Sequence, residues 1–148
     1  MMFRRILVIC TGNICRSPAG ERLLRRALPG VTVDSAGIPG LSGYPADRMM
    51  QAVCEAGGIT LDGHLSRPVT PAMLHGYDLL LAMEQSHIRQ LTVRAPEARG
   101  KTLLFSHWTE NGHNRNITDP FGQNRQVFEQ VFGQLEQAAR AWAQHLRG

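Results

Sequence analysis

The sequence has few cysteines and no long hydrophobic run. Its three cysteines, Cys10, Cys15 and Cys54, form an odd and sparse set, which argues against the disulfide framework of a small secreted domain. No apolar run approaches the roughly 18 residues of a membrane span. The apolar stretch after Arg4 and Arg5 is too short for a signal peptide and lacks a cleavage site. We therefore expect a cytoplasmic protein that does not insert into a membrane.

Lysine is nearly absent, since Lys101 is the only one and arginine supplies the other positive charges. The formal net charge of +4 suits an anionic substrate. Nucleic acid is also anionic, but the arginines are scattered and form no basic stripe, so we expect no nucleic-acid partner. A length of 148 residues, with 43% hydrophobic and 19% charged residues, is typical of one globular domain. We predict one domain over 1–148, and a monomer.

Short apolar runs alternate with segments of helical periodicity along the chain. Strands are predicted over 3–9, 32–36, 77–83 and 101–105. Helices are predicted over 18–28, 47–56, 84–93 and 127–146, with a short helical turn that begins at 70–71. The segments 37–45 and 109–118 are expected to be irregular. This order predicts an α/β fold, a single three-layer domain with a four-stranded parallel sheet and helices on both faces. In such sheets ligands bind beyond the carboxyl ends of the strands.

The segment Cys10–Pro18, with the sequence CTGNICRSP, lies between the first predicted strand and the first predicted helix. The consecutive apolar residues 6–9 indicate a strand buried on both faces. Ser17 and Pro18 predict a helix start with Ser17 as the capping side chain. The backbone N–H groups of the loop can then converge on an anion at the positive end of the helix. The sequence therefore predicts a phosphate-binding loop after the first strand.

Cys10 is the candidate nucleophile of this loop. A thiol at a helix N-terminus beside an arginine is ionised at neutral pH far more than a free thiol. Arg16 offers a planar fork that matches two phosphate oxygens, at a helix position where a cation without an anion is unfavourable. Gly12 and Asn13 tolerate the left-handed conformations that an anion-wrapping loop needs. The alternative is that Cys10 is a buried structural cysteine.

Four segments together resemble the low-molecular-weight protein tyrosine phosphatases: Cys10–Pro18, Asp34–Gly37, Tyr77–Met83 and Asp119–Phe121. The similarity covers nearly the whole chain and is closest to bacterial enzymes found with exopolysaccharide export systems. It implies hydrolysis of phosphotyrosine through a phosphocysteine intermediate, without cofactor or metal. The implied partner is a tyrosine-phosphorylated protein, for which a bacterial tyrosine autokinase of polysaccharide export is our expectation.

The resemblance also implies residue roles. Cys10 is the nucleophile, Arg16 clamps the phosphate, and Asp119 acts as general acid and then as base. By sequence alone, Asp119-Pro120 is equally a turn. The other residues implied to bind phosphate are Thr11, Gly12, Asn13, Ile14, Cys15 and Ser17. Asn13, Ser17, Ser35 and His64 are implied to support the loop by hydrogen bonds.

Leu41 and Phe121 are the predicted walls of the substrate slot. Eukaryotic members of the family tend to carry an aromatic residue at the position of Leu41 and two aromatic residues after Asp-Pro. In this chain Phe121 is followed by Gly122, so we expect a more open slot that depends more on the protein partner. A further departure is Gly20, where alanine is usual, at a cost of about 1 kcal/mol in helix propensity.

Several alternatives are open at this point. Cys15 could form a protective disulfide with Cys10 or only pack the loop, while Cys54 is expected in the core. Arsenate reductases of similar fold need further resolving cysteines, and 70–100 contains none. A non-catalytic phosphotyrosine-binding module would be favoured only if a catalytic residue were replaced. A metal site of Cys10, Cys15 and His64 is disfavoured because the cysteines lack zinc-type spacing.

Overall fold

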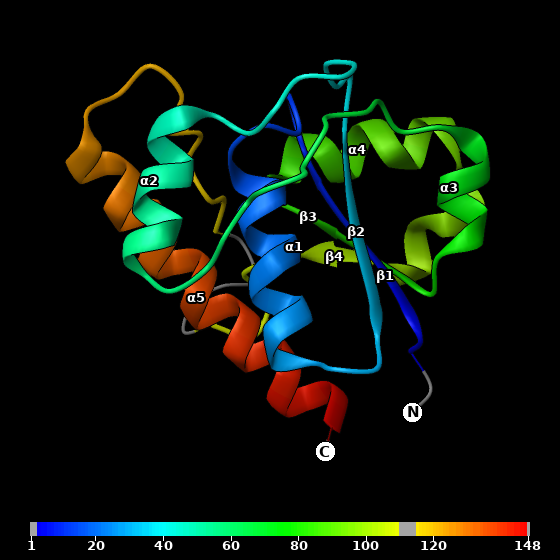
Figure 1. The fold of residues 1–148 in the computed structure, drawn as a ribbon. Coiled ribbons are helices and arrows are strands. Elements are labelled where there is room, and N and C mark those ends of the chain that lie inside the picture. The colour runs from blue at the N-terminus through cyan, green and yellow to red at the C-terminus, as the bar shows by residue number, and fades with distance from the viewer. Residues whose placement is uncertain (1–2, 110–114, 148) are drawn as a thin grey trace.

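The computed structural model describes residues 3–109 and 115–147, which form a sheet enclosed by helices (Figure 1). In chain order the elements are β1 Arg5–Cys10, α1 Arg16–Ala27, β2 Thr32–Gly37, α2 Arg48–Ala56, α3 Pro71–Gly76, β3 Leu79–Ala82, α4 Gln85–Arg94, the 3-10 helix η1 Pro96–Lys101, β4 Thr102–Leu104 and α5 Arg125–Arg147. The prediction of an α/β fold with strands and helices in alternation is confirmed.

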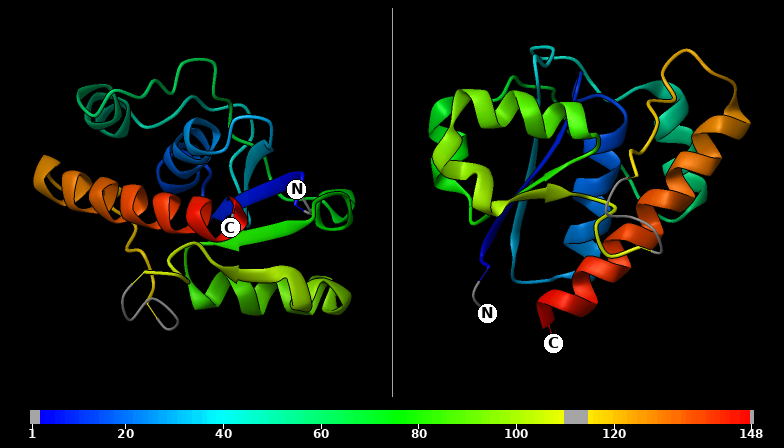
Figure 2. Two further views of the ribbon diagram at one scale, coloured as in Figure 1. Left: turned by 90° about the horizontal axis from the view of Figure 1, so that it is seen from below. Right: turned by 180° about the vertical axis from the view of Figure 1, so that it is seen from behind.

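The four strands form one parallel sheet with the order β2-β1-β3-β4. The helices α1, α2 and α5 lie on one face, and α3 and α4 lie on the other (Figure 2). Residues 6–9 of β1 are fully buried, as expected for a strand covered on both faces. Because β2 and β3 pair with opposite edges of β1, the strand order reverses at the carboxyl end of β1. Ligands of open parallel sheets bind at such a point.

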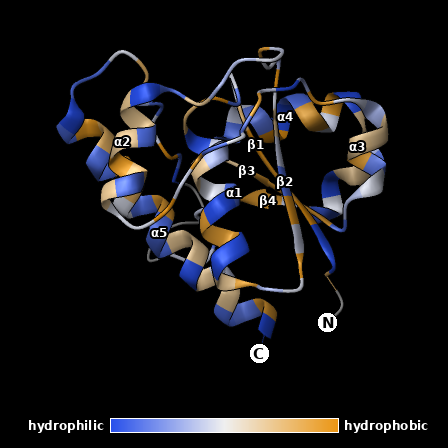
Figure 3. Ribbon diagram, viewed as in Figure 1, coloured by the Kyte–Doolittle hydropathy of each residue, from blue (hydrophilic) through white to orange (hydrophobic). Residues whose placement is uncertain are grey.

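The long helix α5 supplies one side of the larger hydrophobic cluster. Its buried residues recur at helical spacing, as the sequence predicted, and in Figure 3 hydrophobic and hydrophilic residues alternate along α5. Cys54 is also fully buried, as predicted. At Gly20 of α1, a Cβ atom would lie 3.2 Å from Phe105 Cζ and 3.3 Å from Met83 Cε. The glycine therefore permits close packing of α1, which offsets its low helix propensity.

Two local predictions, the start of the first helix and its cap, are wrong. The helix α1 begins at Arg16 and not at Pro18, and its N-cap Cys15 makes no side-chain cap bond. The Ser17 side chain is engaged in the loop and does not cap the helix. Asn13 is left-handed with φ of 63°, but Gly12 is not among the residues with positive φ. The 3-10 helix η1 was not predicted because a single short turn carries no helical periodicity.

The segment 109–118 is only partly described. Residues 115–118 have no regular secondary structure, in agreement with the prediction, and 110–114 lie outside the described residues. Among the helices of the described ranges, none combines the length and the hydrophobicity needed to cross a membrane.

Candidate active site

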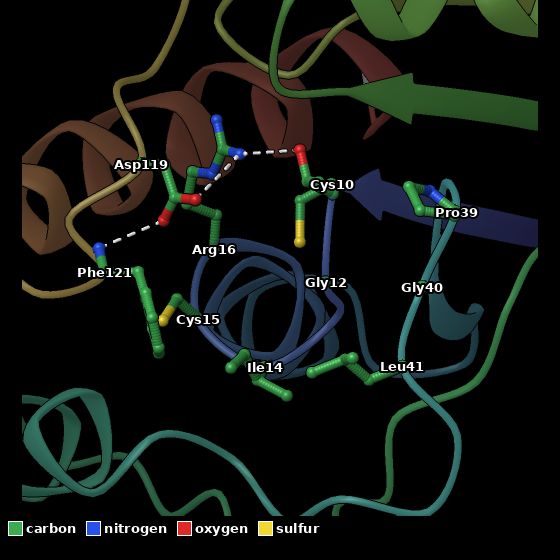
Figure 4. Close-up of a pocket in the computed structure, with 11 residues that line it drawn as sticks. Cys10, Gly12, Ile14, Cys15, Arg16, Pro39, Gly40, Leu41, Asp119 and Phe121 are labelled. Atoms are coloured by element: carbon green, nitrogen blue, oxygen red, sulfur yellow. Dashed lines mark hydrogen bonds and ion pairs between the residues drawn. The ribbon is translucent and has the colours of Figure 1, made fainter.

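The loop after β1 places the Cys10 sulfur within hydrogen-bond distance of a backbone N–H and of a serine hydroxyl. Cys10 is 2% exposed. Its Sγ accepts a hydrogen bond from the Asn13 backbone N–H at 3.3 Å and lies 2.9 Å from Ser17 Oγ. Figure 4 shows the sulfur pointing into the space between Arg16 and Asp119 on one side and Ile14 and Leu41 on the other. The contacts with Asn13 and Ser17 therefore hold the sulfur in place at the cavity.

Asn13 is the centre of the loop's support. Its buried side chain donates from Nδ2 to Ser17 Oγ at 2.8 Å and to Ser35 Oγ at 3.0 Å. Its Oδ1 accepts from the Arg67 backbone N–H at 2.9 Å, and its carbonyl oxygen lies 2.7 Å from His64 Nε2. A carbonyl only accepts, so His64 donates through Nε2. Burial lowers the pKa of His64, which favours the neutral ring. The structure thus brings together the four residues expected to support the loop.

The guanidinium of Arg16 is only 1% exposed and is held from three directions. Its Nη1 donates to Glu84 Oε2 at 2.5 Å and to the Ile117 carbonyl at 2.7 Å. Its Nη2 donates to Thr11 Oγ1 at 3.3 Å. A buried cation is costly unless it is paired and hydrogen-bonded, and Glu84 supplies the pairing charge. The fixed fork leaves Nη2 directed toward the space above the loop.

Asp119 reaches the same space from the segment that precedes α5. Its Oδ2 lies 3.8 Å from Arg16 Nη2, and its Oδ1 accepts from the Phe121 backbone N–H at 3.1 Å. The segment is tied to the sheet by the Ile117 N–H, which donates to the Met83 carbonyl at 2.9 Å. The Asp119 side chain is 45% exposed. The structure therefore brings the carboxylate to the loop but leaves it accessible to solvent.

These groups line a cavity of about 230 Å3. Its lining consists of Cys10, Thr11, Gly12, Ile14, Cys15, Arg16, Pro39, Gly40, Leu41, Asp119 and Phe121. Leu41 and Phe121, the predicted slot walls, both belong to it and are 41% and 59% exposed. Asn13, Ser17, Ser35 and His64 are not among the lining residues. The cavity combines a polar floor with apolar walls, which suits an aromatic phosphate.

The wall that contains Leu41 is attached to the phosphate-binding loop through backbone hydrogen bonds. Gly40 donates to the Thr11 carbonyl at 2.8 Å, and Leu41 donates to the Gly12 carbonyl at 3.1 Å. Gly40 has φ of 77°, and a Cβ atom there would lie 2.7 Å from Pro68 Cα. Only glycine fits this close approach without a shift of the backbone. The position of Leu41 over the loop therefore follows from the backbone itself.

Cys15 also faces the cavity, at 3% exposure. Burial, followed by the nearby Asp47 and Asp119 carboxylates, raises the pKa of its thiol. Burial also raises the pKa of Cys54 to about 12. Both thiols are therefore protonated at neutral pH, and all three cysteines are free. A disulfide between Cys10 and Cys15 stays a prediction.

Sequence reasoning missed two residues of the site, Glu84 and His87. Glu84 holds Arg16, and His87 Nε2 lies 2.9 Å from Thr11 Oγ1. The available signal was positional, because Glu84 follows the end of the buried strand β3 by two residues and so lies at the same sheet edge as Cys10. Burial and the charge of Arg16 lower the pKa of His87 to about 4.

A metal site is not built from these residues. Across 3–109 and 115–147, His, Cys, Asp and Glu side chains form no group of three or more suited to a metal ion. His64, considered with Cys10 and Cys15 as a possible ligand, instead bonds to the Asn13 carbonyl.

The chain matches known proteins over almost its full length. The family model described as low molecular weight phosphotyrosine protein phosphatase matches residues 5–148. The protein-tyrosine-phosphatase Etp of Escherichia coli K12 is 51% identical over 146 residues, which are 99% of this chain and 97% of Etp. The crystal structure of the tyrosine phosphatase Wzb from Escherichia coli K30 in complex with sulphate has a TM-score of 0.93 and 50% identity, covering 98% of this chain and 99% of Wzb. Wzb of Vibrio vulnificus in complex with benzylphosphonate has a TM-score of 0.91 and 43% identity, covering 97% and 99%.

Proposed function

This chain belongs to the low molecular weight protein-tyrosine phosphatase family, and we propose that Cys10, Arg16 and Asp119 carry out its hydrolysis of phosphotyrosine. The main support for this proposal is that Cys10, Arg16 and Asp119 line one cavity. The Cys10 sulfur lies at its floor, and Asp119 Oδ2 lies 3.8 Å from Arg16 Nη2. Residues 1–148 would act as one catalytic domain and as a monomer.

In the first step, the Cys10 thiolate attacks phosphorus and the bond from phosphorus to the tyrosyl oxygen breaks. Asp119, in its protonated form, donates its proton to the departing oxygen, so that tyrosine leaves as a neutral phenol. The loop amides of 11–17 and the Arg16 fork stabilise the charge on the phosphoryl oxygens. The product of this step is a phosphocysteine and an Asp119 carboxylate.

In the second step, water attacks the phosphocysteine and the sulfur–phosphorus bond breaks. The Asp119 carboxylate takes a proton from that water, which regenerates the acid for the next cycle. Cys10 leaves as a thiolate, stabilised by the Asn13 N–H and by Ser17. Because both steps use the same carboxylate, the partial exposure of Asp119 is useful, since water must reach it.

The walls of the cavity support an aryl phosphate as substrate. Ile14, Leu41 and Phe121 present apolar surface around the polar floor. Vibrio vulnificus Wzb forms a complex with benzylphosphonate, which combines an aromatic ring with a tetrahedral phosphonate. A ligand with an aromatic ring and a tetrahedral anion also suits the cavity of this chain. Since Leu41 and Phe121 are partly exposed, part of the binding energy must come from the protein around the phosphotyrosine.

We infer that the partner is a tyrosine autokinase of bacterial polysaccharide export, dephosphorylated in the cytoplasm.

The experiment is the substitution Cys10→Ser, with Cys54→Ser as the matched control. Loss of the nucleophile should lower kcat for an aryl phosphate by more than about 10³-fold. Binding of inorganic phosphate should remain, because the loop amides and Arg16 are unchanged. The Cys54→Ser enzyme should keep its kcat, since Cys54 is buried away from the cavity. Turnover by Cys10→Ser above about one per cent of wild type would remove Cys10 from this role.

A further inference from the structure

The start of α4 contacts the phosphate-binding loop through His87, which the mechanism above does not use. The His87 side chain is 1% exposed. Its Nε2 lies 2.9 Å from Thr11 Oγ1, and its Nδ1 accepts a hydrogen bond from the Glu84 backbone N–H at 3.1 Å. Glu84 is the residue whose carboxylate holds Arg16. One helix start therefore contacts both the guanidinium and the hydroxyl that border the cavity.

The geometry fixes the tautomer of His87. A backbone N–H can only donate, so Nδ1 is the acceptor and carries no proton. A neutral imidazole must then carry its proton on Nε2, and Nε2 donates to Thr11 Oγ1. The ring is neutral at neutral pH because burial and Arg16 lower the pKa of His87 to about 4, although Glu84 and Asp119 act in the opposite direction.

The Thr11 hydroxyl consequently receives two hydrogen bonds, one from His87 Nε2 at 2.9 Å and one from Arg16 Nη2 at 3.3 Å. A hydroxyl has two lone pairs and one proton. With both lone pairs occupied, the hydroxyl proton is left to donate. Thr11 is part of the cavity lining, so the proton is available to an acceptor that enters the cavity.

We infer that His87 is a positioning residue that orients the Thr11 hydroxyl as a donor to an oxygen of the bound phosphoryl group. This inference rests on the proposed function, which places that group over Cys10. A hydroxyl rotated the other way would direct a lone pair at an anion and weaken its binding. His87 removes this rotamer by occupying the lone pair, and the Glu84 amide removes the tautomer that could accept from Thr11. The contact strengthens oxyanion binding without moving a proton.

Two amide substitutions at His87 separate this role from helix capping. Glutamine in His87→Gln can keep a donor near the position of Nε2 but lacks an acceptor at Nδ1. Asparagine in His87→Asn can keep the acceptor for the Glu84 N–H but does not reach Thr11. If the contact with Thr11 matters, His87→Asn should lose about tenfold in kcat/KM for an aryl phosphate and in affinity for inorganic phosphate. His87→Gln should recover most of this loss. The reverse order of the two variants would overturn the inference.

The Thr11 hydroxyl is tested by Thr11→Val and Thr11→Ser. Valine removes the hydroxyl with little change in shape and should lower phosphate affinity about tenfold, whereas serine should restore it. The double variant Thr11→Val with His87→Asn should be no worse than Thr11→Val alone, because both remove one contact. If the losses of phosphate affinity in Thr11→Val and His87→Asn added up in the double variant, His87 would not act through Thr11. The matched control is His75→Asn at the exposed His75 of α3, which should leave both measurements unchanged.

The same series separates this inference from the proposed function. If wild type is active and Cys10→Ser is not, the proposed function holds. Under that outcome, a His87→Asn enzyme with wild-type phosphate affinity refutes only the positioning role. If Cys10→Ser retains turnover, the proposed function itself fails.

Discussion

The phosphate-binding loop and the segment that carries Asp119 meet over one cavity but are built differently. Asn13, Arg16 and Ser17 of the loop are 0 to 1% exposed. The polar atoms of Asn13 and Arg16 are hydrogen-bonded to β2, to the N-cap residue of α4 and to residues 64 and 67. The Asp119 side chain is 45% exposed, lies 3.8 Å from Arg16 Nη2 and accepts a hydrogen bond from the N–H of Phe121. The loop side chains are fixed for one tetrahedral anion, whereas the Asp119 side chain is exposed on a segment that is anchored to the sheet through Ile117.

This difference matches the chemistry of each region. The charge on a phosphoryl group is the same in every phosphotyrosine substrate, so a rigid cradle has no disadvantage. The leaving group belongs to a protein that differs from substrate to substrate, and water must enter in the second step. An acid on an exposed segment, next to the exposed wall Phe121, can meet both demands. An exposed side chain with few contacts also adjusts its position at low cost.

The largest effect should come from Asp119→Asn, which removes the acid on the exposed side of the cavity. Amide cannot donate the proton, so kcat for phenyl phosphate should fall by about 10²–10⁴-fold. Substrates with a good leaving group, such as p-nitrophenyl phosphate, need less protonation and should lose much less. The comparison of the two substrates in steady-state kinetics is the measurement. Asp62→Asn, at an exposed acid distant from the cavity lining, is the control. Equal losses for both substrates would argue against proton donation.

A smaller effect on activity is expected from removing the buried hydrogen bonds of the Asn13 side chain. The substitution Asn13→Ala removes three side-chain hydrogen bonds, which should lower the free energy of unfolding by about 2–4 kcal/mol and kcat/KM by about 10- to 100-fold. Asn13→Gly loses the same bonds but tolerates φ of 63°. It should be about 1 kcal/mol more stable than Asn13→Ala and equally impaired. Urea unfolding and kinetics measure both quantities. Wild-type activity in Asn13→Gly would show that the bonds do not hold the loop.

The smallest effect is expected from substitutions in the two cavity walls, Leu41 and Phe121, which should change KM for an aryl phosphate. Leu41→Phe adds an aromatic face on the wall fastened to the loop, and should lower KM for an isolated aryl phosphate by about two- to tenfold. Phe121→Leu removes one from the exposed wall and should raise KM by a similar or smaller factor. Neither should change kcat by much, since both walls contact the ring and not the phosphorus. A change in kcat with KM constant would show that the walls also position the acid.

Local patterns were sufficient to predict the four strands and the five α-helices, but not the 3-10 helix η1 or the start of α1. The apolar run of β1 and the periodicity of α5 depend on neighbours in sequence, and both were predicted. The cap of α1 was mispredicted because Ser17 is a good capping residue only if its hydroxyl is free. In the fold, Cys10 and Asn13 compete for that hydroxyl. A propensity rule cannot include partners that it does not see.

The sequence by itself determined that a loop with the residue types of a phosphate-binding loop follows a buried strand in an α/β protein, and which cysteine, arginine and aspartate are candidates to act. These features follow from residue types at short spacings, where the backbone dictates the geometry. Only the tertiary structure decided what fixes them: Arg16 is held by Glu84 and by the Ile117 carbonyl, 68 and 101 residues away in the chain. Thr11 is oriented by His87, 76 residues away. Contacts at such separations depend on strand order and register, because the parallel sheet places the carboxyl ends of β1 and β3 side by side.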